Sequence, residues 1–148
     1  MDKIRTSVCI ATYNEAKFLK EQIESLLHQT ILPDEIVVSD DSSSDDTPRI
    51  LEEYQNRHPR LFRIFLHKDN LGFVGNFERC LKEARGDFVV LCDQDDIWLP
   101  EKLEKQIRIF QQYPEVGMVF CDLKVVNSNL ALVRNSFWDI LGFREEGD

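Results

Sequence analysis

Residues 88–96 hold a short apolar run that ends abruptly in acidic residues. Phe88-Val89-Val90-Leu91-Cys92 is followed by Asp93, Asp95 and Asp96, three carboxylates within four positions. A short, continuous apolar run is typical of a strand buried on both faces of a parallel sheet. Ligands of open α/β sheets bind just beyond the carboxyl ends of such strands. The run therefore predicts an α/β fold with a binding site at this acidic end.

The carboxylates of residues 93–96 repel one another, which favours a bound cation. At about 5 Å and an effective dielectric constant of about 20, one pair of like charges costs roughly 3 kcal/mol. A divalent metal with oxygen ligands is the simplest cation for such a site. The alternative is an Asp-rich loop that begins the next helix, because Asp is common in turns and at helix N-termini. The motif alone favours the two interpretations equally.

Composition is that of a globular protein with a substantial core. The 148 residues are 43% hydrophobic and 10% aromatic, which is ordinary for such proteins. The net charge of −9 argues against nucleic acid as a partner. The sequence contains no apolar run of membrane-spanning length and no signal-peptide core at its start. The four cysteines have no metal-ligand spacing, so we expect reduced thiols in a cytoplasmic protein.

Strands are expected to alternate with helices along the chain. The expected strands are residues 7–11, 35–39, 61–66, 88–92 and 116–121. The expected helices are residues 16–28, a helix with Thr47 as N-cap that ends before Pro59, residues 74–84 with Gly86 as C-cap, and residues 100–113. This alternation predicts an α/β sandwich with a mostly parallel central sheet and helices on both faces.

Polar residues follow three of the expected strands where each strand ends. Tyr13 and Glu15 follow the first strand, Asp40 and Asp41 the second, and residues 93–96 the fourth. The carboxyl ends of parallel strands lie on one edge of a sheet, so these side chains should lie close together. Structural turns explain one such cluster, whereas three on one edge favour a ligand site.

The chemistry of this edge is compatible with a nucleotide. The sequence has no glycine-rich phosphate loop, so the phosphates of a nucleotide would need a metal to neutralise them. Tyr13 could stack on a base, and an Asp carboxylate could accept a hydrogen bond from a base N–H or a ribose hydroxyl. The structural alternatives are that Tyr13 packs at a strand end and that Asp41 is a turn residue.

Taken together, these segments resemble the family 2 glycosyltransferases with the GT-A fold. The resemblance covers residues 5–126. The matching segments are residues 8–15, residues 36–47, Asn70-Leu71-Gly72 with Asn76, and residues 86–96. The string Asp-Gln-Asp-Asp-Ile-Trp-Leu-Pro at residues 93–100 is similar to bacterial rhamnosyltransferase-like members that build surface polysaccharides. The resemblance implies a nucleotide-sugar-binding core at residues 1–126, followed by an apolar tail at residues 127–148.

The resemblance also implies roles for individual residues. Asp41 would hydrogen-bond a pyrimidine base, Asp93 would face the ribose, and Asp95 would bind Mn²⁺ or Mg²⁺ that bridges the diphosphate. The other residues with an implied part in nucleotide binding are Ala11, Tyr13, Glu15, Asn70, Gly72 and Asn76. Ser42 stands where glycine is commoner in the family, so this turn is expected to differ in backbone conformation.

The implied reaction is inverting transfer of a sugar from a UDP- or dTDP-sugar to a saccharide or lipid-linked acceptor. A general base, an Asp or Glu that lies well beyond Asp122 in the family, would deprotonate the acceptor. The carboxylates beyond that point are Asp139, Glu145, Glu146 and Asp148. None of them has a recognisable family context, so we expect the catalytic base to be absent from this chain. The apolar tail is expected to pack on a missing part of the protein or on a second copy in a homodimer.

Three other functions are compatible with parts of the sequence. A haloacid dehalogenase-type phosphotransferase also uses an Asp-x-Asp motif, but after its first strand rather than its fourth. A calcium-binding or nucleotide-sensing module could use the run of Ser and Asp at residues 39–46, although that run lacks the glycine of an EF-hand loop. A glycosyltransferase-like domain that binds a nucleotide sugar without catalysis remains the third alternative.

Overall fold

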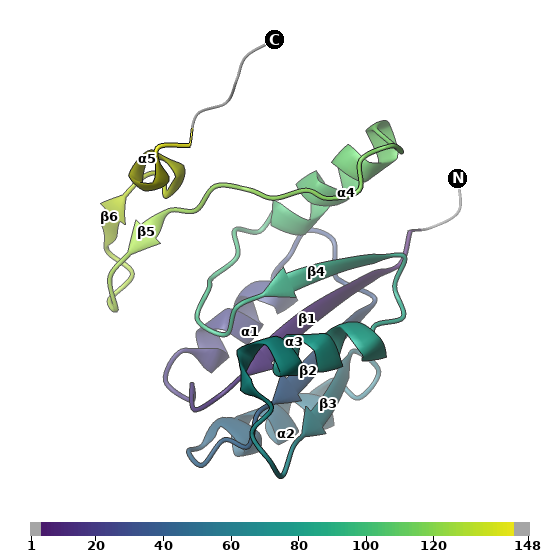
Figure 1. The fold of residues 1–148 in the computed structure, drawn as a ribbon, viewed down its shortest axis with the longest axis vertical. Coiled ribbons are helices and arrows are strands. Elements are labelled where there is room, and N and C mark those ends of the chain that lie inside the picture. The colour runs from purple at the N-terminus through teal and green to yellow at the C-terminus, as the bar shows by residue number, and fades with distance from the viewer. Residues whose placement is uncertain (1–3, 144–148) are drawn as a thin grey trace. The chain divides into compact units, whose positions relative to one another are not determined.

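The computed structural model describes residues 4–143 and contains a four-stranded parallel sheet (Figure 1). β1 (Thr6–Thr12) lies between β2 (Glu35–Asp40) and β4 (Phe88–Cys92), and β3 (Phe62–Leu66) pairs with the other edge of β2. Cys9 of β1 is in register with Val37 of β2 and with Leu91 of β4. The order β3-β2-β1-β4 places the carboxyl ends of all four strands on one edge.

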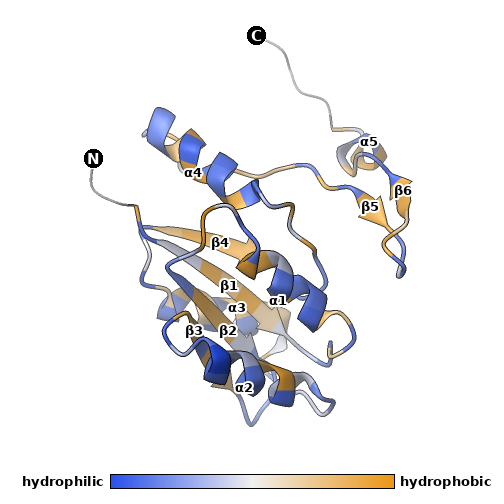
Figure 2. Cartoon of the chain, turned by 180° about the vertical axis from the view of Figure 1, so that it is seen from behind, coloured by the Kyte–Doolittle hydropathy of each residue, from blue (hydrophilic) through white to orange (hydrophobic). Residues whose placement is uncertain are grey.

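Helices cover both faces of this sheet, which confirms the α/β sandwich. Because successive strand residues point to opposite faces, Val8 and Ile10 pack in one apolar cluster and Cys9 in another. The larger cluster includes residues of α1 (Leu19–Leu27), α2 (Thr47–Arg57) and α4 (Lys102–Gln112). The smaller one includes Cys80 of α3 (Gly72–Glu83). Figure 2 shows α1 and α2 in front of the largely apolar strands.

The helical spacing of apolar residues explains why α1 adheres to the sheet. Leu19, Ile23 and Leu26 follow one another at intervals of four and three residues and are fully buried, as in an amphipathic helix. Full burial of one such side chain contributes about 1.5–3 kcal/mol. These residues therefore fix α1 on the sheet face opposite α3.

Several expected helix ends are wrong. Residues 15–18 precede α1 as a turn in which the Glu15 carbonyl accepts the N–H groups of Phe18 and Leu19. Thr47 is the first residue of α2 rather than its N-cap, because its hydroxyl oxygen accepts the Glu15 N–H while Asp45 accepts the Thr47 N–H. The predicted helix at residues 100–113 begins at residue 102 and ends at residue 112.

The prediction that Gly86 caps α3 is wrong. α3 ends at Glu83, and its C-cap Ala84 is extended. Gly86 instead lies against β1: a Cβ atom there would come within 2.6 Å of the Ser7 nitrogen and 2.9 Å of the Arg5 carbonyl oxygen. Glycine is required at this position because the backbone of the turn before β4 approaches the backbone of β1 closely.

The expected strand at residues 116–121 is also wrong, since this segment contains no strand. Its apolar pattern fits a strand, but a strand needs a partner for its backbone hydrogen bonds, and none pairs with it among residues 4–143. The strands that do form are short: β5 (Val125–Val126) pairs in antiparallel fashion with β6 (Leu132–Arg134). The four-residue α5 (Trp138–Leu141) follows them.

The chain divides into two compact units, Met1–Gln111 and Gln112–Asp148. The first unit contains the parallel sheet. In the second, the rings of Phe120, Trp138 and Phe143 pack edge to face. This division by compactness does not test the predicted functional boundary after residue 126. Within the described residues, no helix combines the length and apolar character needed to span a membrane.

Candidate functional site

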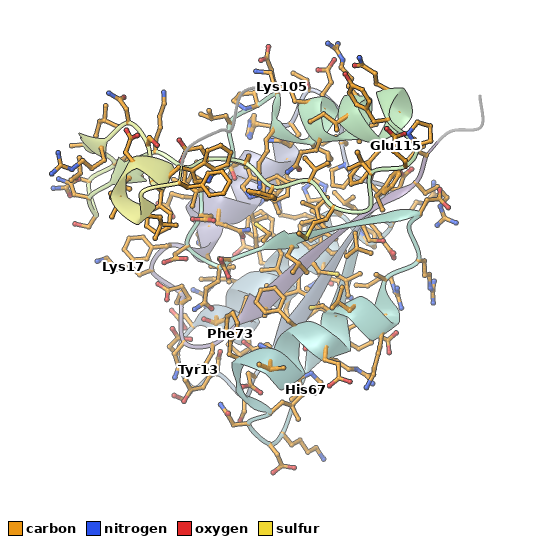
Figure 3. All side chains as sticks on the ribbon, turned by 45° about the horizontal axis from the view of Figure 1, so that its top comes forward. Tyr13, Lys17, His67, Phe73, Lys105 and Glu115 are labelled. Carbon is orange, nitrogen blue, oxygen red and sulfur yellow. The ribbon has the colours of Figure 1, made fainter. Side chains whose placement is uncertain are left out.

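A pocket of about 420 Å³ lies at the carboxyl ends of β1, β2 and β4. It is bordered by the loop that follows each of these strands and by the start of α3. Its lining residues are Ala11, Thr12, Tyr13, Asp41, Asn70, Gly72, Phe73, Asn76, Asp93, Gln94 and Asp95. Tyr13 and Phe73 lie near the same end of α3 in Figure 3, and both line the pocket. Segments far apart in the sequence therefore meet here.

Most of the predicted site residues line this pocket. The structure brings together predicted residues from β1 and the loop after it, the β2 loop, the loop before α3, α3 itself and the β4 loop: Ala11, Tyr13, Asp41, Asn70, Gly72, Asn76, Asp93 and Asp95. Glu15 does not line it, although its carboxylate accepts a hydrogen bond from Gln94 at 3.3 Å. The prediction that these polar ends share one edge of the sheet is correct, while their individual roles stay predictions.

The run of Ser and Asp after β2 holds the β1 and β2 loops together. The Asn14 N–H donates to Ser43 Oγ at 2.8 Å, and Asn14 Oδ1 accepts the Ser44 N–H at 2.8 Å. Asp40 accepts from the Thr12 hydroxyl at 2.8 Å and from the Ser43 N–H at 3.0 Å. These bonds give the run a structural role, and no cluster of three or more metal-binding side chains occurs in residues 4–143.

Two residues of these loops have a left-handed backbone conformation. Asn14 has a φ angle of 50° and Ser42 one of 65°. Asparagine is one of the few residues besides glycine that adopt this conformation, and the Asn14 side chain accepts the N–H of Ser44 from the β2 loop. Ser42 pays a steric cost for the same conformation, which glycine would adopt freely. The turn after β2 is therefore strained at Ser42.

Asp41 connects the end of β2 to the start of α3. Its side chain is buried, with 3% of the residue exposed. Its carboxylate oxygens accept the N–H groups of Leu71 at 2.5 Å and Gly72 at 2.9 Å. A carboxylate at a helix N-terminus satisfies free N–H groups and interacts favourably with the helix dipole. Each oxygen keeps a second lone pair, so Asp41 can still accept a hydrogen bond from a ligand.

Asn76 has a free hydrogen-bond acceptor beside the pocket. Its Nδ2 donates to the Thr12 carbonyl at 3.1 Å, which joins α3 to the end of β1. Its Oδ1 is buried and has no partner among the described residues. An unsatisfied buried acceptor costs free energy, which an N–H or O–H of a ligand would recover. The pocket thus offers acceptors from Asp41 and Asn76 to the same ligand.

The acidic loop after β4 carries two carboxylates, Asp93 and Asp95, without a basic partner in the described chain. Asp93 and Asp95 are exposed, and neither forms an ion pair with a basic side chain of the described chain. Burial, followed by the charges of Asp93 and Asp95, raises the pKa of Asp96. Burial and the charges of Asp95 and Asp45 likewise raise the pKa of Glu15. The site is therefore electronegative and favours a cation.

The residues present fit a divalent metal that is shared with a phosphate ligand. Mg²⁺ is typically bound by one or two carboxylates together with substrate phosphates, rather than by a complete set of protein ligands. Asp95 supplies a hard oxygen donor of this kind at the pocket wall. A diphosphate in the pocket would supply the remaining oxygens.

Sequence reasoning assigned no role to three pocket residues, Thr12, Phe73 and Gln94. Phe73 is 72% exposed, and a phenylalanine directly after the loop glycine Gly72 could have indicated an aromatic pocket wall. Gln94 lies between the two aspartates of the motif, so its position could have indicated a contact across the edge of the sheet. Thr12 carried no separate signal.

No general base is identified among the described residues at the end of the chain, 127–143. Asp139 lies in the first turn of α5, where its N–H donates to Ser136 Oγ at 3.1 Å. Glu145, Glu146 and Asp148 lie outside the described residues. The expectation that the base is absent from this chain stays a prediction.

Four parallel strands, helices on both faces and a polar pocket at the strand ends define an α/β protein that binds its ligand at the carboxyl edge of the sheet. The family model for glycosyl transferase family 2 matches residues 7–146. The chain belongs to that family, as the resemblance implied.

Two curated relatives match most of this chain. An uncharacterised protein of Mycobacterium tuberculosis is 38% identical over 122 residues, which cover 81% of this chain and 35% of that protein. The dTDP-rhamnosyl transferase RfbG of Shigella flexneri is 35% identical over 102 residues, which cover 66% of this chain and 35% of that enzyme. The chain thus spans about a third of the length of these relatives.

Solved glycosyltransferases share the fold. The mannosyltransferase PcManGT of Pyrobaculum calidifontis, in complex with GDP-Man and Mn²⁺, has a TM-score of 0.72 and 28% identity, with 83% of this chain and 36% of that chain covered. S. aureus TarS 1–349 in complex with UDP has a TM-score of 0.67 and 28% identity, with 83% and 42% covered. The GT-A fold expected from the sequence is confirmed by these neighbours.

Proposed function

We propose that this chain is the donor-binding part of an inverting glycosyltransferase that uses a UDP- or dTDP-sugar. The acceptor is a saccharide or a lipid-linked saccharide, and the product belongs to a surface polysaccharide. The similarity to a rhamnosyl transferase supports this class of product. The proposal extends to the cytoplasm as the site of reaction, because all four cysteines are free and free thiols are typical of a reducing compartment.

One observation carries the proposal: a single pocket combines an exposed aromatic ring, buried acceptors and unpaired carboxylates. Tyr13, 49% exposed, offers a ring for stacking on a base. Asp41 and Asn76 offer acceptors for the N–H of a uracil or thymine base. Asp93 and Asp95 would serve the ribose and the metal-bound diphosphate. Each component matches one part of a nucleoside diphosphate.

The proposed reaction exchanges one bond at the anomeric carbon of the sugar. The acceptor oxygen forms a bond to this carbon, and the bond from the carbon to the phosphate oxygen breaks. The acceptor proton passes to a general base, and the diphosphate leaves with the electron pair. Mn²⁺ or Mg²⁺, held by Asp95, would stabilise the negative charge on the leaving diphosphate. Asp41 and Tyr13 would hold the nucleoside in place.

The test is thermal unfolding of the chain with UDP, dTDP, GDP and ADP, each with Mn²⁺ and with EDTA. A ligand that binds only the folded protein raises its melting temperature by mass action. We expect UDP or dTDP to raise it more than GDP or ADP, and more with Mn²⁺ than with EDTA. Equal shifts for all four nucleotides would contradict the base assignment, and equal shifts with metal and chelator would contradict the metal assignment.

Activity separates a transferase from a domain that only binds the donor. We expect the chain to bind UDP- or dTDP-sugars without transferring the sugar, because the general base is expected elsewhere. Addition of an acceptor and measurement of released diphosphate tests this point. Turnover by residues 1–148 alone would show that the base lies within them.

We propose that the chain forms a homodimer through the second unit, which contains the C-terminal tail. Its exposed apolar residues support this proposal: Met118, Phe120, Leu130, Leu132, Val133, Ile140 and Leu141 are each more than half exposed. Sedimentation of the chain at several concentrations tests it. A strictly monomeric protein at all concentrations would contradict the homodimer.

A further inference from the structure

We infer that Gln94 is a positioning residue that fixes the metal-binding loop after β4 against the base-binding loop after β1. This inference rests on the proposed function, because it assigns Asp95 to the metal and Tyr13 to the base. Gln94 is assigned no contact with the metal or the base. Its role is to keep these two contacts at a fixed separation, so that one nucleoside diphosphate can make both.

The sheet itself does not provide this connection. The ladder between β1 and β4 ends at the pair formed by Ile10 and Cys92, before either loop enters the pocket. Beyond that pair, the Gln94 side chain joins the loop after β4 to the loop after β1. Its Oε1 accepts the Tyr13 N–H at 2.6 Å, and its Nε2 donates to Glu15 Oε2 at 3.3 Å. The amide therefore extends the attachment of β4 to β1 past the end of the ladder.

Apart from those of Gln94, no hydrogen bond in the described chain joins these two loops. Asp93, Asp95, Asp96 and Ile97 form no hydrogen bond to another secondary-structure element or loop within residues 4–143. The next anchored residue is Trp98, whose N–H donates to Ser25 Oγ at 3.0 Å. Among residues 93–97, only Gln94 forms a hydrogen bond to another loop in the described chain.

The other walls of the pocket have attachments of their own. Asp41 fixes the β2 loop to the N-terminus of α3, and Asn76 fixes α3 to the end of β1. Loss of Gln94 should therefore free the acidic loop and leave the remaining walls in place. The chemistry also requires a neutral amide here: Gln94 both accepts and donates, whereas a carboxylate would face Glu15 with like charge.

A freed loop changes the binding of a diphosphate more than that of a nucleoside. Uridine has no phosphate, so it can contact the base-binding and ribose-binding residues without a metal. UDP with Mn²⁺ bridges both loops, and a mobile loop must then be ordered at a cost in affinity. The expected signature is a selective loss of the affinity that Mn²⁺ adds to UDP.

The experiment compares the wild-type chain with Gln94→Met, which keeps the approximate length of the side chain and removes all three hydrogen bonds of the amide, two to the Tyr13 backbone and one to Glu15. Calorimetry measures the affinities for uridine, for UDP with EDTA and for UDP with Mn²⁺. In the variant we expect UDP with Mn²⁺ to bind about tenfold more weakly, since the loss of a hydrogen bond contributes a factor of that order. Uridine should bind within about twofold of the wild type. Gln111→Met, an exposed site outside the pocket, is the matched control and should change neither affinity.

Amide hydrogen exchange provides an independent measurement on the same variant. The Tyr13 amide should lose protection in Gln94→Met, whereas the amides of Leu71 and Gly72, which donate to Asp41, should keep theirs. This pattern distinguishes release of one loop from general destabilisation. Equal loss of protection at all three amides would overturn the positioning role.

The possible outcomes separate this inference from the proposed function. If the wild-type chain binds neither uridine nor UDP, the proposed function fails, and the inference with it. If the wild type binds UDP in a metal-dependent way and Gln94→Met binds it equally well, the inference alone fails. A loss of uridine and UDP affinity by the same factor also overturns it, because Gln94 would then act on the base site only.

Discussion

The carboxylate of Asp41, just after β2, accepts the backbone N–H of Gly72, the first residue of α3, at 2.9 Å. Its other oxygen accepts the Leu71 N–H. One side chain thus attaches the N-terminus of α3 to the end of the sheet. Gly72 has a φ angle of 74°, which lets the chain turn into the helix at this point. The same carboxylate lines the pocket, so the fold and the site share a residue.

Asp41→Asn should destabilise the protein as well as weaken nucleotide binding. The amide has one oxygen, and its NH₂ group would face one of the two N–H donors. A buried donor left without its acceptor costs about 1–3 kcal/mol. Urea unfolding followed by circular dichroism measures this loss. Asp69→Asn, at an exposed position of the neighbouring loop, should leave stability unchanged; a similar loss in both variants would contradict the role of Asp41.

The sequence predicted the parts of the fold that depend on local patterns. The short, largely apolar runs at residues 88–92, 7–11 and 35–39 identified three strands of the parallel sheet, because burial on both faces leaves a direct compositional signal. Because the carboxyl ends of parallel strands share one edge, Tyr13, Asp41 and Asp95 were predicted to lie close together without any knowledge of contacts. Strand order and pairing were not needed for that conclusion.

Features that depend on a partner could not be predicted in this way. Residues 116–121 have the pattern of a strand, but no described strand pairs with them. Thr47 has the composition of an N-cap, yet its hydroxyl serves Glu15 from another loop. Gly86 resembles a C-cap, yet the approach of β1 explains it. The role of Gln94 likewise depends on a contact with Tyr13, 81 residues away.

Gly86→Ala should lower stability, because the added Cβ would meet backbone atoms of Ser7 and Arg5 as well as the Ser7 hydroxyl. The approaches of 2.6 Å to the Ser7 nitrogen and 2.9 Å to the Arg5 oxygen require the turn before β4 to shift. Overpacking of this kind typically costs about 1–3 kcal/mol. Gly117→Ala is the control, since its Cβ would have no atom within 4 Å. Urea unfolding of both variants tests the difference, and equal stabilities would show that the turn adapts freely.

Glu35 is a buried carboxylate with an acid-sensitive contribution to stability. It accepts hydrogen bonds from the Ser7 hydroxyl at 2.6 Å, the Arg85 N–H at 2.6 Å and the Arg63 guanidinium at 3.1 Å. Burial raises the pKa of Glu35, but these hydrogen bonds and the charge of Arg63 outweigh burial and lower the pKa below its ordinary value of 4.5. The charged form is therefore favoured in the folded state.

The free energy of unfolding should consequently fall in acid, and Glu35→Gln should remove part of this dependence. Because the folded pKa is lower than the unfolded one, the stabilisation is complete above the unfolded pKa, near 4.5. It is lost as the pH falls through the folded pKa. Glu35→Gln should be less stable near neutral pH by about 1–3 kcal/mol, with a smaller further loss in acid. Urea unfolding across this range tests it against Glu52→Gln, an exposed control on α2; parallel pH profiles for wild type and Glu35→Gln would contradict the prediction.

Asp95→Ala should abolish the metal-dependent part of nucleotide binding and leave the fold intact, because Asp95 is exposed and forms no hydrogen bond within the described chain. With UDP and Mn²⁺ at about 100 times the dissociation constant, the wild type should gain about 2.7 kcal/mol of stability. The variant should gain no more with Mn²⁺ than with EDTA. Asp93→Ala provides the contrast, since a ribose contact should be lost equally with and without metal. A variant at residue 95 that unfolds would show that Asp95 is structural.

Ser42→Gly should stabilise the protein relative to Ser42→Ala. Ser42 has a φ angle of 65°, where a side chain costs roughly 1–2 kcal/mol and glycine costs nothing sterically. Both variants lose the 3.2 Å hydrogen bond from Ser42 Oγ to the Lys68 carbonyl, so their comparison isolates the backbone strain. The greater freedom of glycine in the unfolded chain offsets part of the gain, which leaves an expected difference of about 1 kcal/mol in favour of glycine. Urea unfolding of the two variants measures this difference.

Glu52→Gly and Glu52→Ala, on the exposed face of α2, serve as controls and should give the opposite order of stability, because glycine is about 1 kcal/mol less favourable than alanine within a helix. If glycine is the less stable variant at both positions, the turn after β2 is not strained at Ser42.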